Sequence, residues 1–124
     1  MLYTWNDART EVLVIRVDQS KVTIKNGSTD LEIGPANPDV TAELEVTDMP
    51  RESFPYCDEG TKATDRPVTW KVVSGKLKLV LKRRLGSFTP VSVGVDRLVA
   101  ESPDGQQVKQ RRDIQFTAAI SDLK

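Results

Sequence analysis

The sequence predicts an all-β fold: a single-domain antiparallel β-sandwich, or a small β-barrel, of seven to eight strands joined by short hairpins. Three observations predict it. Apolar and polar residues alternate with period two along most of the chain, whereas helical periodicity is nearly absent. Turn-forming pairs such as Asn26-Gly27 and Ser74-Gly75 separate the alternating runs. The 124 residues are enough for one hydrophobic core, so we expect one domain over residues 1–124.

The first half of the chain predicts a three-stranded meander. Its strands cover residues 11–17, 21–25 and 29–33. Two-residue turns at Gln19-Ser20 and Asn26-Gly27 would place Val17 opposite Val22 and Val22 opposite Leu31. Both turns then send the same side chains of the middle strand to the core. A slip of one residue would break that agreement, so we expect this register.

A loop and two further strands complete the first half. Residues 34–39 contain one glycine and two prolines and predict a loop. Residues 41–47 alternate strictly, with Leu44 on the inward face and Glu43 on the outward face. The apolar residues Leu2 and Trp5 at the N-terminus predict an added strand, with self-association as the alternative.

No periodicity is present between Asp48 and Arg66, which predicts a long irregular loop over residues 48–66. Connections of this length are usually functional or mobile. Two roles stay open: the aromatic side chains cap one end of the core, or the loop binds a protein partner. The candidate partner-binding residues are Arg51, Glu52, Phe54, Tyr56 and Asp58.

The stretch 68–82 predicts a hairpin. Apolar residues alternate on both sides of Ser74-Gly75, and a two-residue turn there would place Val72 opposite Leu77 and Trp70 opposite Leu79. The core face of this hairpin is the packing unit that the pattern supports best.

The last hairpin covers residues 91–120. Its turn is Pro103-Asp104-Gly105, which would place Ala100 opposite Val108. The apolar parity reverses near Asp96-Arg97, so we expect a β-bulge at that point.

The charges are balanced overall but divided along the chain. Residues 1–62 hold 12 acidic and 6 basic residues, and residues 63–124 hold 6 acidic and 12 basic residues. One candidate anion-binding stripe lies on the outward face of the hairpin at 68–82, formed by Lys71, Lys76, Lys78, Lys82 and Arg84. The predicted turn sets Lys71 directly opposite Lys78, so such a stripe needs neighbouring carboxylates or a bound anion. We favour carboxylates, supplied by Glu32, Glu43 and Glu45.

The composition excludes several kinds of chemistry. The chain has no histidine and one cysteine, Cys57, which removes histidine triads, histidine or multi-cysteine zinc sites and internal disulfides. Acidic neighbours oppose thiolate formation at Cys57. A hydrolase would need two loop carboxylates, drawn from Asp48, Glu52, Asp58, Glu59 and Asp65, at a set separation. We expect no metal, no cofactor and no enzymatic activity.

Our leading expectation is a binding or assembly module that engages a protein partner, or a second copy of itself, through a strand edge or the loop 48–66. An anion- or glycan-binding domain that uses the lysine stripe is the alternative, and a carboxylate-dependent hydrolase ranks last. We do not expect a nucleic-acid partner, because aromatic residues are only 6% of the chain. No signal peptide or apolar span is visible, so a cytoplasmic location without membrane insertion is the default expectation.

Overall fold

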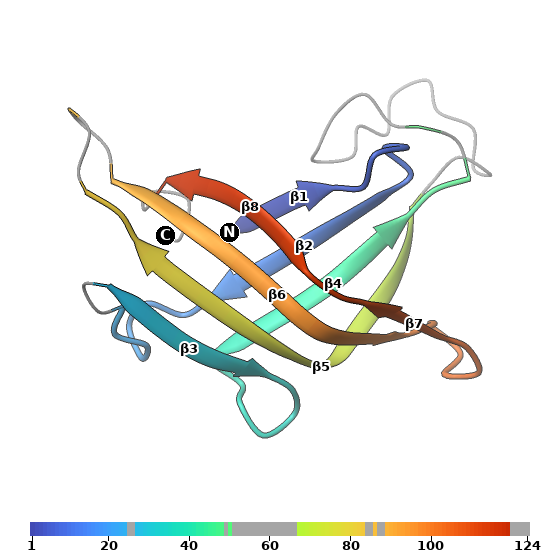
Figure 1. Ribbon diagram of the computed structural model, residues 1–124. Helices are drawn as coiled ribbons and strands as arrows, with labels where there is room; N and C mark the ends of the chain where they lie inside the picture. Colours follow the sequence, from blue (N-terminus) through green and yellow to red (C-terminus); the bar gives the residue numbers. More distant parts are fainter. Residues whose placement is uncertain (25–26, 49, 51–66, 84–85, 87–88, 120–124) are drawn as a thin grey trace.

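The computed structural model describes residues 1–24, 27–48, 50, 67–83, 86 and 89–119 (Figure 1). Within these ranges the fold is all-β, as predicted: eight strands form one antiparallel sheet that curls into a half-barrel. No helix in these ranges is long and apolar enough to span a bilayer. The strands are β1 (Leu2–Trp5), β2 (Glu11–Val17), β3 (Ser28–Ile33), β4 (Val40–Val46), β5 (Val68–Leu81), β6 (Pro90–Glu101), β7 (Val108–Arg111) and β8 (Ile114–Ala119).

Two long strands organise the sheet, and each changes its partner along its length. The strand order is β1-β2-β4-β5-β6-β7, with β3 also on β5 and β8 also on β6. One edge of β5 pairs with β4 over residues 68–71 and with β3 over residues 75–80. One edge of β6 likewise pairs with β8 and then with β7. Strands β3 and β4 therefore lie end to end along β5.

The bulge predicted at Asp96-Arg97 is confirmed. Val95 and Leu98 are three positions apart, a spacing that places two residues of a regular strand on opposite faces, yet both are buried. The positions that face the core therefore change from odd to even numbers between them. Arg97 has φ +52°, and Asp113, between β7 and β8, has the same value. The inward positions thus change at neighbouring points of β6 and of the β7–β8 segment, and the sheet bends there.

The hairpin predicted at Ser74-Gly75 is wrong. Residues 68–81 form one continuous strand that bends at this point, where its pairing with β6 shifts. Val72 lies opposite Ala100 rather than Leu77. A Cβ at position 75 would make ordinary van der Waals contact with Leu98, at 3.6 Å from its Cα, and the glycine lies within the bent strand instead of reversing the chain.

The predicted N-terminal meander is also wrong. β2 pairs with β1 and β4, and β3 pairs with β5, so Val17 lies opposite Val40 rather than Val22. Residues 21–24 are not in a strand, and the predicted turn residue Asn26 lies outside the described residues. The physical reason is burial: Val17 and Val40 are both buried in the long-range pair, a contact that local turn chemistry does not report.

Other expectations are confirmed. Residues 2–5 add a strand next to β2, residues 34–39 are a loop, and Ala42 and Leu44 face the core. The last hairpin turns where predicted, with Gly105 at φ +74°, but Ala100 pairs with Lys109 rather than with Val108. The shift arises because Ser102 N–H donates to the carbonyl of Gln107, which closes a four-residue loop between them.

The core fills the concave side of the sheet. Inward side chains of every long strand meet there, among them Leu13, Leu44, Leu77, Leu79 and Val93, each at most 3% exposed. Trp70 and Phe116 pack against this cluster from its margin. Burial of this apolar surface supplies the main driving force for folding.

We expect engineered disulfides to distinguish the continuous strand from the predicted hairpin. In a Cys57→Ser background, Glu43→Cys with Lys71→Cys joins facing residues of β4 and β5, and a disulfide should form. Lys71→Cys with Lys78→Cys, which face each other only in the hairpin, should stay reduced. Mass spectrometry after mild oxidation reads both outcomes, and the reverse result would disprove the register.

We expect the last hairpin to lose stability in acid. Hydrogen bonds from the Ser102 hydroxyl and then from Gln106 N–H lower the pKa of Asp104. A lowered pKa in the folded state contributes stability above the usual pKa of aspartate, and this contribution disappears as the pH falls through the lowered value. Asp104→Asn should remove that acid dependence, as followed by amide chemical shifts of β6 and β7. An unchanged acid transition would contradict the assignment.

Candidate functional site

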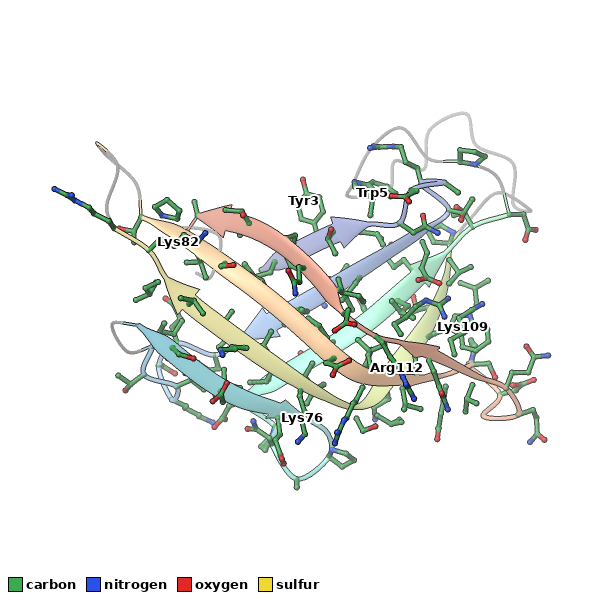
Figure 2. The ribbon with its side chains drawn as sticks, in the orientation of Figure 1. Tyr3, Trp5, Lys76, Lys82, Lys109 and Arg112 are labelled. Atoms are coloured by element: carbon green, nitrogen blue, oxygen red, sulfur yellow. The ribbon has the colours of Figure 1, made fainter. Side chains whose placement is uncertain are left out.

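The lysine stripe lies on one face, as predicted, but its surroundings differ from the prediction. Lys71, Lys76 and Lys78 project from the convex face of β5 and are exposed; Figure 2 labels Lys76 at the lower centre of the view and Lys82 at the upper left, beyond the end of β5. Lys71 does not face Lys78, because it lies between Glu43 of β4 and Glu101 of β6.

Carboxylates flank the other two lysines as well. Lys76 lies between Glu32 of β3 and Asp96 of β6, and Lys78 faces Asp30 of β3. Carboxylates therefore lie opposite the lysines across the sheet, as favoured from the sequence for Glu32 and Glu43, whereas Glu45 lies opposite Thr69. Lys82 is exposed beyond the end of β5, and Arg84 lies outside the described residues. Compensated charge of this kind gives an anion little net attraction.

A groove crosses the same face. It has a volume of about 620 Å³, and Gly94 in its lining borders open space, since a Cβ built there would meet nothing within 4 Å. Its walls come from four strands that are far apart in the sequence. The groove is lined by residues 30–32 of β3, 76–78 of β5, 94–96 of β6 and 113–115 at the start of β8.

Among the described residues, β3 pairs with a strand on one side only, so its other long side is a strand edge. Leu81 N–H donates to the carbonyl of Gly27 at 2.9 Å, and bonded pairs recur at every second residue of an antiparallel ladder. The register therefore directs the backbone groups of Thr29, Leu31 and Ile33 toward β5. The backbone N–H and C=O of Ser28, Asp30 and Glu32 point away from β5, to the opposite side of the strand.

The far side of β3 is only partly covered. Asn37 Nδ2 donates to the carbonyl of Glu32 at 2.8 Å, which confirms the direction of that carbonyl. Among the described residues, nothing bonds to the backbone N–H or C=O of Asp30. No described strand pairs with β3 on this side, since β2, which runs beside β4, ends at Val17. The alternating pattern of residues 21–25 predicted a strand beside β3, so this edge was not predicted.

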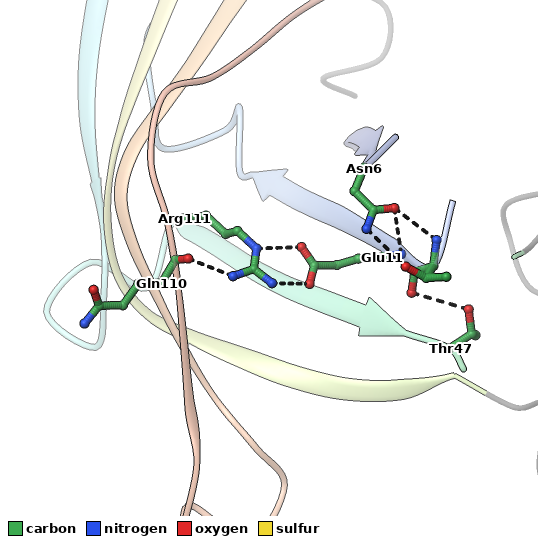
Figure 3. Close-up of polar contacts among 6 residues, drawn as sticks. Asn6, Glu11, Thr47, Gln110 and Arg111 are labelled. Atoms are coloured by element: carbon green, nitrogen blue, oxygen red, sulfur yellow. Dashed lines mark hydrogen bonds and ion pairs between the residues drawn. The ribbon is translucent and has the colours of Figure 1, made fainter. Parts of the chain in front are cut away.

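A second polar feature lies inside one end of the half-barrel. Arg111 of β7 binds Glu11 of β2 through two hydrogen bonds, Nε–Oε2 at 2.9 Å and Nη2–Oε1 at 2.6 Å (Figure 3). Asn6 accepts hydrogen bonds from the backbone N–H groups of Thr10 and Glu11 and so orders the turn before β2. Glu11 raises the pKa of Arg111, and partial burial of the guanidinium opposes this effect. The pair links two strands that lie far apart in the sheet order.

Lys109 extends this polar end. Its Nζ lies 4.7 Å from the centre of the Trp70 ring, a cation–π contact. The sequence pattern predicted Trp70 in the core but did not predict Lys109 and Arg111 as inward residues. The predicted register set Val108 opposite Ala100 and so directed Lys109 and Arg111 outward, whereas in the structure they lie opposite the buried residues Ala100 and Leu98.

The predicted loop site cannot be placed beside these features. Arg51, Glu52, Phe54, Tyr56 and Asp58 all lie outside the described residues, so the loop stays a prediction. Within the described ranges, no three histidine, cysteine, aspartate or glutamate side chains gather in a way that could hold a metal ion.

Comparisons of this chain with protein-family models, with curated proteins and with solved structures find no match.

We expect the Glu11–Arg111 pair to stabilise the fold more than an exposed ion pair does. Glu11 and Arg111 side chains are 11% and 34% exposed, against 28% and 52% for Glu43 and Arg16, whose ion pair spans β4 and β2. Glu11→Gln should cost about 1–2 kcal/mol, because it leaves a partly buried guanidinium without its carboxylate. The matched control Glu43→Gln should cost less than about 1 kcal/mol. Urea unfolding measures both, and equal costs would contradict the assigned role.

Proposed function

We propose that this domain is a non-enzymatic binding module that engages a protein partner by adding a strand to the exposed edge of β3. The observation that carries the proposal is the orientation of Asp30, whose backbone N–H and C=O point away from β5 and have no partner among the described residues. Backbone groups arranged in this way supply hydrogen bonds to an incoming strand, and alternate side chains supply selectivity.

A contrast with β7 supports the choice of β3. The ladder between β6 and β7 directs the Gln110 carbonyl away from β6, and Arg111 Nη1 donates to that carbonyl at 2.7 Å. This side chain covers part of the β7 edge, a common way to prevent unwanted pairing. The centre of β3 has no such cover among the described residues.

We also favour a barrel over a sandwich for the architecture. Two observations support this: all eight strands belong to one hydrogen-bonded sheet, and the Glu11–Arg111 pair connects β2 with β7 across the concave side. Two separate facing sheets would define a sandwich. A barrel wall of this kind holds the β3 edge on a rigid support.

The test removes one edge-facing N–H and leaves the internal ladder intact. Asp30→Pro deletes a donor that points away from β5, and proline is tolerated at such edge positions. The probe is an acetylated peptide of alternating threonine and valine, followed by hydrogen exchange and by NMR titration. We expect the wild-type chain to bind it with protection of the Asp30 amide, and Asp30→Pro to lose binding while it stays folded.

Two controls make the test decisive. Leu31→Pro removes a donor that bonds to β5, so it should destabilise the sheet by about 3 kcal/mol. Glu32→Pro removes the next edge-facing N–H and replaces Asp30→Pro if that variant does not fold. Unchanged peptide binding in a folded edge variant, or no binding by the wild-type chain, would overturn the proposal.

A further inference from the structure

The convex side of the β3 edge carries only polar and acidic side chains. Ser28, Asp30 and Glu32 share this side, and all three are exposed. A strand added to β3 would place every second side chain directly beside them, where opposite charges attract and like charges repel. The edge therefore selects its partner by charge as well as by hydrogen bonding.

The two carboxylates are not held in close ion pairs inside the described part of the chain. Lys78 and Lys76 lie opposite Asp30 and Glu32 in the register, yet no amino nitrogen of theirs is within 4.0 Å of either carboxylate. Asp30 and Glu32 also form one wall of the groove. They can therefore accept hydrogen bonds from a partner on their other side.

A second copy of this chain is an unfavourable partner for the β3 edge, because its own β3 carries the same charges. In antiparallel pairing of two β3 strands, the registers that overlap most place Asp30 opposite Asp30 or opposite Glu32 of the other copy. Each such pair sets carboxylate against carboxylate, which is destabilising. Charged residues on an edge commonly prevent self-association in this way.

Resting on the function proposed above, we propose that the occupant of the β3 edge is an extended segment of another protein with lysine or arginine at alternate positions. The basic side chains lie beside Asp30 and Glu32. The intervening side chains lie on the concave side, next to the half-buried Leu31, and are apolar. Basic and apolar side chains therefore alternate along the partner segment.

The test uses three acetylated peptides of equal length whose alternate positions are all lysine, all threonine or all glutamate. Two cross-strand charge pairs should make the lysine peptide bind about tenfold or more tightly than the glutamate peptide, with threonine between them. High salt should reduce this difference. Equal binding of all three would overturn the charge selection while edge binding stands, and no binding by any would overturn edge binding itself.

Charge reversal locates the selection on β3. Asp30→Lys combined with Glu32→Lys should invert the order of the lysine and glutamate peptides. The matched control Asp96→Lys changes a carboxylate of the same groove that lies on β6, two strands away, and should leave the order unchanged. If Asp96→Lys inverts the order instead, the peptide lies across the groove and the edge assignment is wrong.

Mixing two forms of the chain tests the exclusion of a second copy. The wild-type chain should be monomeric at neutral pH in size exclusion with light scattering. Added to the Asp30→Lys, Glu32→Lys variant, it should form a heterodimer, because the two edges then carry opposite charges. A wild-type dimer that Asp30→Pro abolishes would overturn the inference, since a second copy would be the occupant.

Discussion

The bend shared by β5 and β6 is the constraint on which the rest of the structure depends. At this level the pairing of β5 with β6 shifts, and Arg97 and Asp113 take left-handed backbone conformations so that the inward parity reverses on neighbouring strands. Beyond the bend, β5 needs a new partner on one edge, and β3 takes the place that β4 leaves. The separate edge of β3 is therefore a geometric result of bending one sheet into a half-barrel (Figure 1).

The alternating pattern controls the electrostatics as strongly as it controls the core. Because β3, β4 and β6 all direct carboxylates to the convex face, the lysines of β5 stand among them and the face is compensated. Among these carboxylates, Asp30 and Glu32 lie on β3, whose far side pairs with no described strand. The same periodicity that buries Leu77 and Leu79 thus leaves an acidic row at the edge.

Local patterns in the sequence predicted strands and faces well but did not predict pairing. The inward residues of β4, the added strand at Leu2 and the parity reversal near Arg97 all follow from spacing along the chain, and the structure confirms them. Pairing of β2 with β4 and of β3 with β5 depends on contacts between distant residues, which turn signals such as Ser74-Gly75 do not encode. The candidate edge on β3 was missed for that reason, since it depends on which strand lies beside it.

The loop 34–39 has a consequence for how such a domain could diversify. It connects two strands, β3 and β4, that pair with successive parts of the same edge of β5. The length of the loop therefore does not set the register of β3 or of β4 against β5, and insertions in the loop leave both ladders unchanged. The side chain of Asn37 already donates a hydrogen bond to the Glu32 carbonyl, so a longer loop would extend along the same edge of β3. A longer connection between β3 and β4 would therefore cover more of the backbone edge of β3 while the core stays unchanged.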